Sequence, residues 1–320
     1  MRRTESTTGF ARLRRVAIAI FQIAALFVCL LQFSPGLLAQ TSEPDNSLPF
    51  YMGEELRYQN SNIFARTMYS TVGSLANVAY WDQRDWWAAG LTAAGTLLLM
   101  APTSPSPDVR FQDWVLDGRN PVLDTLLPRL TSERFIYFGA GLIGSTALAG
   151  WAFDSPELSE LASLALESLA VAQFLHVSQK LLIGREGPAQ GDGQGIIYGP
   201  SRSWEFFPSG TPSGHTASLF AITALVVDYA DNIYIDMLGY FCYVYIGVSV
   251  IYNNQHFISD VVWGAPFGYA VGKWVARHRS SKYKYKNGAP VRKTGIRLSG
   301  AMPWIDDATG AGGFSLLWSW

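Results

Sequence analysis

The sequence predicts an all-α protein built as a bundle of six helices. Of its 320 residues, 49% are hydrophobic and 15% are charged, which is enough apolar surface to bury a large core. Six apolar stretches have helical length and periodicity, and turn-forming or polar residues separate them. The expected helices cover Trp86–Met100, Phe135–Phe153, Leu158–Leu182, Gly214–Tyr229, Tyr234–Ile251 and Ile258–Ala276.

Residues 1–39 have the features of an export signal. Several arginines precede the apolar run Val16–Leu31, and the breaker Ser34-Pro35-Gly36 follows it. We expect cleavage near Ala39. An uncleaved membrane anchor is the alternative, because the run is about as long as a short anchor. In either case the remainder of the chain is expected to begin outside the cytoplasm.

Composition divides the remaining chain into three parts. Residues 40–84 form a polar linker and a weakly amphipathic segment, residues 85–279 contain the six expected helices, and residues 280–320 begin with a basic tail. A solvated tail and a contact with anionic lipid are both open for this basic stretch. Gly295–Ile305 and Gly313–Trp320 resemble two short strands around a Gly-rich turn, which favours a C-terminal β-hairpin.

The segment Thr211-Pro212-Ser213-Gly214-His215 marks the start of the fourth expected helix. Thr211 suits the N-cap and Pro212 suits the first helical position. The free backbone N–H groups of the first turn, with Gly214 leaving space for close approach, form a site for an anion such as phosphate.

Five side chains predict phosphoryl transfer. His256 and Asp260 are four residues apart, so both project from one helix face and the carboxylate can hold the imidazole in one tautomer. An imidazole held in this way can attack phosphorus, and His215 can donate a proton to the leaving oxygen. Lys180 supplies positive charge for the non-bridging oxygens, and Arg185 adds a forked donor.

At these residues the chain resembles the type 2 phosphatidic acid phosphatase (PAP2) superfamily, which includes lipid phosphatases, periplasmic acid phosphatases and vanadium haloperoxidases. The family pattern is Lys, six residues, Arg-Pro; then Pro-Ser-Gly-His; then Ser-Arg, five residues, His, three residues, Asp. The resemblance covers about Trp86 to Ala276 and implies a PAP2-type six-helix bundle. It also implies His256 as nucleophile, Asp260 as its orienting acid, His215 as general acid, and Lys180, Ser213 and Gly214 as phosphate ligands.

Two positions depart from the family pattern. Gly187 stands where the first arginine is expected, and Val250 stands where the second is expected. Charge-assisted contacts are worth about 1.5 to 3 kcal/mol each, so we expect the loss of both to weaken phosphate or transition-state binding by roughly a hundredfold to several thousandfold or more. We expect Arg185, two residues before Gly187, Arg202, in the following loop, or both to reach the phosphate instead.

Other functional classes lack support in the sequence. No zinc-ligand spacing or recognition helix indicates binding to nucleic acid. Glu160 and Glu167 lack a partner histidine at a convincing spacing, so we expect structural roles and no metal site. A lone histidine in an apolar stretch is usually a core residue, and we interpret His176 in this way.

Together these features predict a bacterial cell-envelope phosphatase that acts on a phosphomonoester or diphosphate through a phosphohistidine and without a cofactor. A phosphorylated lipid is the favoured substrate, with membrane association and a site that faces the periplasm. A catalytically impaired binding or structural relative is the alternative. In a further alternative, a haloperoxidase, vanadate would be a cofactor rather than an inhibitor.

The number of membrane spans and the choice between inner and outer membrane stay open. An export signal followed by three crossings would place the site in the cytoplasm. Either one helix does not cross, or Asn60–Trp81 adds a crossing, or the bundle is not threaded through the bilayer.

Overall fold

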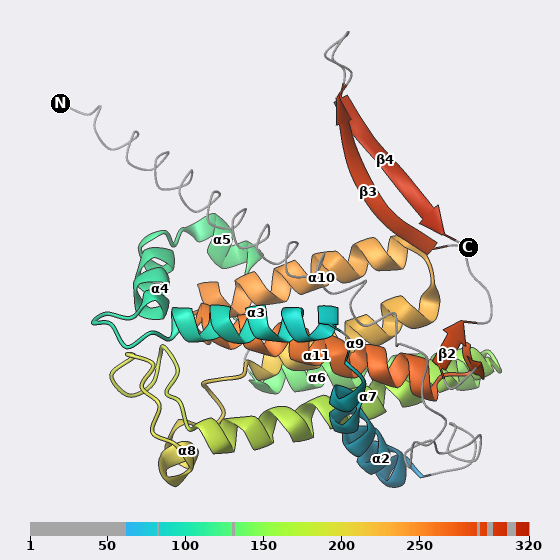
Figure 1. Cartoon of the computed structure of the whole chain (residues 1–320), viewed down its shortest axis with the longest axis horizontal. Coiled ribbons are helices and arrows are strands. Elements are labelled where there is room, and N and C mark those ends of the chain that lie inside the picture. The colour runs from blue at the N-terminus through green and yellow to red at the C-terminus, as the bar shows by residue number, and fades with distance from the viewer. Residues whose placement is uncertain are drawn as a thin grey trace.

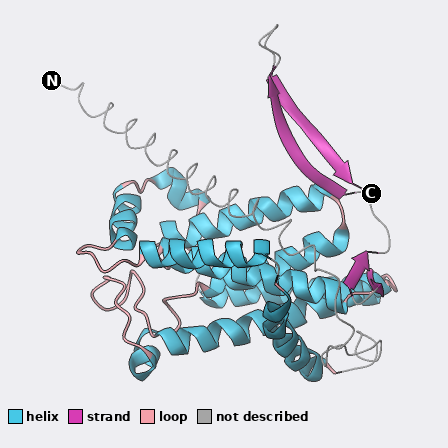
Figure 2. Cartoon of the chain, viewed as in Figure 1, coloured by secondary structure: helices cyan, strands magenta, loops and turns pink. Residues whose placement is uncertain are grey.

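The computed structural model describes residues 62–81, 83–129, 132–286, 289–292, 297–305 and 312–319. The expected export signal, residues 1–39, lies outside the described residues. Most of the described chain is helical, with the long helices stacked side by side (Figures 1 and 2). In chain order, the helical elements in these ranges are α2 (Ile63–Ala76), η2 (Asn77–Tyr80), α3 (Gln83–Leu99), α4 (Pro107–Asp117), α5 (Pro121–Leu126), α6 (Ser132–Ala152), α7 (Pro156–Ile183), η3 (Pro200–Arg202), α8 (Ser203–Phe206), α9 (Gly214–Ala230), α10 (Ile233–Tyr252) and α11 (Ile258–Arg279).

The all-α prediction is confirmed, because each of the six expected helices forms. They are α3, α6, α7, α9, α10 and α11, and each begins and ends within about three residues of its expected bounds. Helix α2 lies within the segment that the sequence analysis describes as weakly amphipathic.

Helices α9 and α11 run parallel and in close contact at the centre of the bundle. A Cβ atom on Gly268 would lie 2.1 Å from the carbonyl oxygen of Ala217, and one on Gly272 would lie 2.1 Å from that of Ala221. Any larger residue would force the two helices apart. Because the contacts advance by one turn on both helices in the same direction, the starts of α9 and α11 lie at the same end of the bundle.

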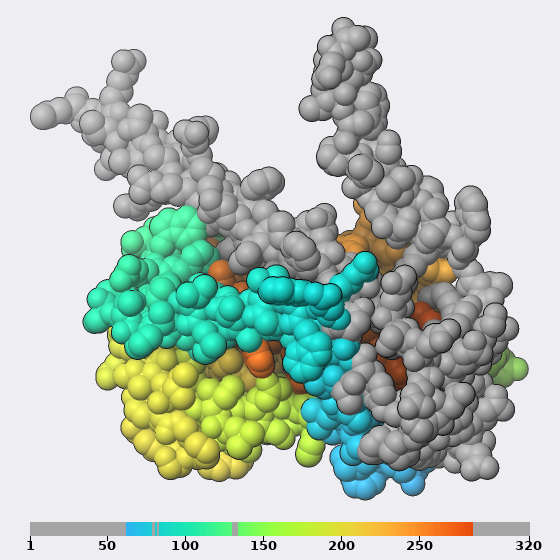
Figure 3. Space-filling model, viewed as in Figure 1, coloured from blue at the N-terminus to red at the C-terminus, as the bar shows by residue number. Residues whose placement is uncertain are grey.

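Two short helices in the link between α3 and α6 were not predicted. The Ser106 hydroxyl accepts a hydrogen bond from the Val109 amide at the start of α4, and the Asn120 side chain accepts one from the Leu123 amide at the start of α5. In both cases proline follows the cap, which is a recognisable helix-start signal. In Figure 3 the green surface of α4 and α5 lies above the yellow surface of the loop after α7, at the same end of the molecule.

Several helices present apolar surface to the outside. Within the residues that the structure describes, three helical segments are long and apolar enough to cross a membrane: Arg134–Ala152, Pro156–Ile183 and Ile233–Tyr252. Only 6% of the apolar stretch in the first segment, which belongs to α6, is buried inside the protein. Trp151 in the same helix is 79% exposed. Surface of this kind indicates association with a membrane.

The C-terminal part contains two antiparallel strand pairs. β1 (Tyr283–Lys286) pairs with β2 (Ala289–Arg292), and β3 (Arg297–Ile305) pairs with β4 (Gly312–Ser319). The second pair lies where the sequence predicts a hairpin. The first pair occupies residues that the sequence analysis assigns to the basic tail and was not predicted.

Candidate active site

Two histidines from different segments meet where α9 and α11 begin. The ring centroids of His215 and His256 are 5.8 Å apart, with the rings inclined at 68°. His215 lies in the first turn of α9, and His256 lies two residues before α11. On its other side, His215 contacts Phe135 of α6, with ring centroids 4.9 Å apart. The parallel packing of the two helices therefore brings together imidazoles that are far apart in the sequence.

His256 and Asp260 form the expected pair. The Nδ1 atom of His256 lies 3.3 Å from Oδ2 of Asp260, and both side chains are buried. Burial alone would raise the pKa of Asp260, but the charge of Arg185 and the hydrogen bond with His256 outweigh it and hold that pKa below its ordinary value. An ionised Asp260 favours the proton on Nδ1, which leaves the lone pair on Nε2 for chemistry.

The pKa of the His256 imidazole is lowered. Burial is the main cause, because a buried imidazolium loses hydration, and the hydrogen bond with Asp260 offsets only part of this effect. His256 is therefore neutral at a lower pH than an ordinary histidine, as a nucleophile requires.

The N-cap of helix α9 lies two residues after the expected cap. Ser213, rather than Thr211, is the N-cap, and its hydroxyl accepts a hydrogen bond from the Thr216 amide at 3.4 Å. The Thr211 hydroxyl instead donates to Oδ1 of Asp260, and the Ser213 amide donates to the Asp260 carbonyl at 3.0 Å. The start of α9 is thus attached directly to the start of α11.

Gly214 lacks a side chain where the ring of His176 packs against the start of α9. A Cβ atom there would lie 2.7 Å from Nε2 of His176. His176 is buried, as the sequence analysis expects of a core residue, but its ring packs against the first turn of α9. Its proximity to this motif could not be inferred from an apolar stretch that contains one histidine.

Lys180 is buried one turn beyond His176 on α7. Its Nζ atom donates to the Ser209 carbonyl at 2.9 Å and to the Gly210 carbonyl at 2.7 Å. These bonds hold the segment that leads into α9. An ammonium group has three N–H donors, so one donor remains after these two bonds.

The two candidate replacement arginines have very different surroundings. The Arg185 side chain is 1% exposed and forms ion pairs with Asp260 and Asp108, each at 2.8 Å. The Arg202 side chain is 47% exposed, pairs with Glu205 at 2.6 Å, and lies over the Tyr198 ring. The structure therefore joins Arg185 to the His256–Asp260 pair through Asp260, whereas the contacts of Arg202 are on the loop surface.

Because Arg202 is engaged at the surface, we expect Arg202→Ala to change kcat/KM by less than about twofold. An exposed ion pair of this kind contributes little. The measurement is steady-state hydrolysis by the purified full-length protein, with Glu205→Ala as the control that breaks the same pair from the other side. A tenfold or larger loss in the arginine variant alone would show that its side chain reaches the substrate.

Neither departure from the family pattern leaves an open space in the structure. A Cβ atom on Gly187 would lie 1.8 Å from Oγ of Ser209, so a larger residue there requires Ser209 to move. Val250 is completely buried in the apolar core.

Asp108 and Ser259 are part of the site but were missed in the sequence. Asp108, in the first turn of α4, accepts hydrogen bonds from the amide and the hydroxyl of Ser259, next to Asp260. Burial raises the pKa of the Asp108 carboxyl, although the charge of Arg185 acts in the opposite direction. In the described part of the chain, no group of three or more His, Cys, Asp or Glu side chains could hold a metal ion.

The comparisons with known proteins agree with this geometry. Residues 161–284 match the model of the PAP2 superfamily. This match supports membership of the PAP2 superfamily. The matched PAP2 segment contains Lys180, the start of α9 and the His256–Asp260 pair, whereas Asp108 and Phe135 precede it.

Among curated proteins, the chain is similar to a lipid A 1-phosphatase from Porphyromonas gingivalis. The two are 38% identical over 79 residues, which is 22% of this chain and 18% of the relative. No solved structure matches the chain significantly. At the level of the family, the PAP2 match and this relative support a phosphoester hydrolase.

Proposed function

We propose that this chain is a cell-envelope phosphatase that hydrolyses a lipid-linked phosphomonoester or diphosphate through a phosphohistidine intermediate. The observation that carries the proposal is the meeting of two buried imidazoles, 5.8 Å apart between ring centroids, of which one is paired with a carboxylate. Such a pair supplies a nucleophile and a separate proton donor, the two groups needed to exchange one P–O bond for another.

In the first step, Nε2 of His256 attacks phosphorus while the bond to the leaving oxygen breaks. His215 donates its proton to that oxygen, and the leaving group departs as an alcohol or a phosphate. Asp260 stabilises the positive charge that develops on the His256 ring. The amides at the start of α9 and the remaining Lys180 donor bind the non-bridging oxygens.

In the second step, water attacks phosphorus and the P–N bond breaks. His215, now neutral, accepts the proton of the water, and His256 leaves as the neutral imidazole. Inorganic phosphate is released and the enzyme returns to its starting state. Each proton and electron pair is accounted for by the two histidines and water.

The lipid nature of the substrate is supported by two independent features. In the described part of the chain, three helices are long and apolar enough to cross a membrane, which favours a substrate that is held in a bilayer. The curated relative is named for its action on lipid A, so a phosphorylated glycolipid is the first substrate to test. Export rests on the N-terminal signal predicted from the sequence.

The test compares the full-length protein with His256→Ala in detergent micelles. Both are assayed with an aryl phosphate and with a lipid-linked phosphomonoester that carries a radioactive phosphate. We expect turnover and an acid-labile, alkali-stable phosphoenzyme in the wild type only. Equal rates in both proteins would favour the binding or structural alternative, and vanadate-dependent bromide oxidation would favour a haloperoxidase.

The lowered pKa of His256 predicts the pH dependence of this activity. The nucleophile must be neutral, and burial moves its pKa below the ordinary value of 6.5. We therefore expect the acid limb of kcat/KM to have its midpoint below 6.5, with activity lost as the pH falls through the shifted pKa. Initial rates across a series of overlapping buffers at constant ionic strength measure this midpoint. A midpoint above 6.5 would contradict the assignment.

A further inference from the structure

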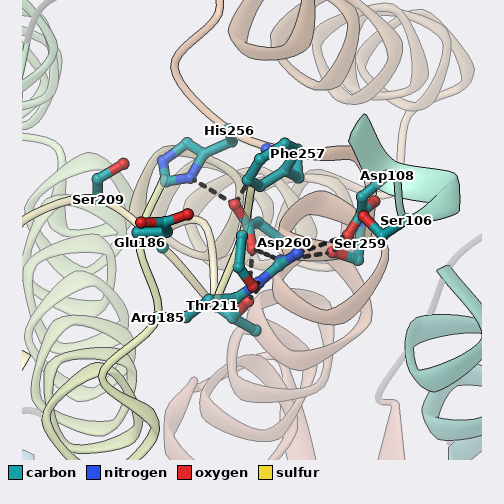
Figure 4. A network of polar contacts seen from close by, with 12 residues as sticks. Ser106, Asp108, Arg185, Glu186, Ser209, Thr211, His256, Phe257, Ser259 and Asp260 are labelled. Carbon is teal, nitrogen blue, oxygen red and sulfur yellow. Dashed lines mark hydrogen bonds and ion pairs between the residues drawn. The ribbon is translucent and has the colours of Figure 1, made fainter. Parts of the chain in front are cut away.

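Arg185 connects three parts of the fold through its guanidinium group. Nε donates to the Gly195 carbonyl at 2.9 Å, Nη1 donates to Oδ1 of Asp260 at 2.8 Å, and Nη2 donates to Oδ2 of Asp108 at 2.8 Å. Nη1 also donates to the Ser259 hydroxyl at 2.8 Å. Figure 4 shows the group between the two carboxylates. Each guanidinium nitrogen is thus engaged by a protein acceptor, which leaves Arg185 poorly suited to bind a phosphate.

The two oxygens of Asp260 have different partners. Oδ1 accepts from Arg185 and from the Thr211 hydroxyl, whereas Oδ2 faces His256 and accepts from the Phe257 amide at 3.0 Å. A carboxylate is planar, so fixing Oδ1 also fixes the direction of Oδ2. The bond from Arg185 therefore determines how Asp260 faces the His256 ring.

Asp108 holds the opposite side of Arg185. Its side chain is fully buried, and it also accepts from the Ser259 amide at 3.1 Å. Oδ1 of Asp108 accepts from the Ser259 amide in the first turn of α11, and Oδ2 accepts from Arg185. The guanidinium therefore cannot rotate without breaking its bonds to both carboxylates. Such a fork requires arginine, since lysine has a single nitrogen.

We propose that Arg185 and Asp108 are positioning residues, a buried ion pair that orients Asp260 toward His256 and thereby sets the reactivity of the nucleophile. This inference rests on the proposed function and replaces the expectation that Arg185 is a phosphate ligand. It assigns a role to α4, which lies outside the segment that matches the family.

The charges around His256 determine the expected effect. Asp260 faces it from α11, Lys180 and His176 act from α7, His215 contacts it from α9, and Arg185 acts from the loop after α7. The charge of Arg185 contributes to lowering the pKa of His256. In Arg185→Gln we expect the Asp108 carboxyl, whose pKa is already raised, to take up a proton, while the hydrogen bonds from His256, Thr211 and Phe257 keep Asp260 ionised. The pKa of His256 should therefore rise.

The experiment uses the full-length protein in detergent micelles. Three variants are compared with the wild type: Arg185→Gln, Arg185→Lys, and a double variant that combines Asp108→Asn with Arg185→Gln. Activity is measured as kcat, KM and the acid limb of the pH profile. The pKa of His256 is measured separately by isotope-edited NMR of the imidazoles, with His256→Gln to assign its signal. This second measurement does not require turnover.

For Arg185→Gln we expect kcat to fall by about 30- to 100-fold with KM changed by less than about threefold. The acid limb and the NMR pKa of His256 should both rise by about 0.5 to 1 unit. Arg185→Lys should keep the pKa near that of the wild type and still lose kcat, because the charge remains while the fork is lost. If Arg185→Gln fails to fold, the double variant, which removes both charges together, carries the same expectations.

The matched control is Arg119→Gln, which breaks an exposed arginine–aspartate pair at 2.9 Å between Arg119 and Asp124. It should leave kcat and the NMR pKa of His256 unchanged. A tenfold rise in KM for Arg185→Gln with unchanged kcat, acid limb and NMR pKa would overturn the inference and assign Arg185 to the phosphate. A wild type without activity but with the expected NMR shifts would sink the proposed function and leave the positioning role in place.

Discussion

Replacing His256 by alanine is expected to lower kcat by about 10⁴-fold or more, because the substitution removes the only atom proposed to bond to phosphorus. The loss should appear in kcat rather than in KM, since the amides at the start of α9 and Lys180 remain to bind the substrate. Asp260→Asn should lose less, about 10²- to 10⁴-fold, because it leaves the nucleophile in place but removes the negative charge beside it. Steady-state rates with the lipid-linked phosphomonoester measure both effects.

The control for this prediction is His278→Gln, which changes the same residue type in the last turn of α11, the helix that begins two residues after His256. His278 stacks on Trp274, with ring centroids 4.5 Å apart. It should retain kcat within about threefold. A His256→Ala variant that keeps more than a tenth of the wild-type rate and still forms a phosphoenzyme would show that another group is the nucleophile.

The features that could be predicted from the sequence are those set by local geometry. Apolar periodicity located the six long helices, and the four-residue spacing of His256 and Asp260 predicted that the two side chains pair. They were expected on one helix face, whereas His256 lies two residues before α11. The start of α9 was predicted at Gly214, although the cap itself was assigned to Thr211 rather than Ser213. Both are good capping residues, and the choice between them depends on the bond from Thr211 to Asp260, which exists only in the folded bundle.

The role of Arg185 could not be predicted because it depends on tertiary contacts. Its partner Asp108 lies 77 residues earlier in the chain, on a helix that was interpreted as part of a charged link. No spacing rule connects the two residues. The Ser106 cap followed by Pro107 was the available signal for this helix, and recognising it would have placed Asp108 in a first helical turn without revealing its partner.

A second buried charge cluster holds α2, α7 and α11 together. Glu167 of α7 is completely buried, and Arg66 of α2 and Arg279 of α11 each place Nε 3.0 Å from one of its oxygens. The Ser70 hydroxyl donates to the same carboxylate. These contacts agree with the structural role expected of Glu167 from the sequence. One carboxylate therefore connects two helices that are far apart in the sequence.

We expect Glu167→Ala to destabilise the protein by about 3 to 5 kcal/mol, because it leaves two buried guanidinium groups without the carboxylate that they share. For a chain of this size, such a change lowers the Tm by about 5 to 15 °C, measured by thermal unfolding in detergent micelles. Glu157→Ala, an exposed glutamate in the first turn of the same helix, is the control and should lower the Tm by less than about 2 °C. Equal effects of the two substitutions would show that the cluster is not needed to hold α2 and α11 against α7. A catalytic role is also excluded if folded Glu167→Ala, assayed well below its Tm, retains the pH profile of the wild type.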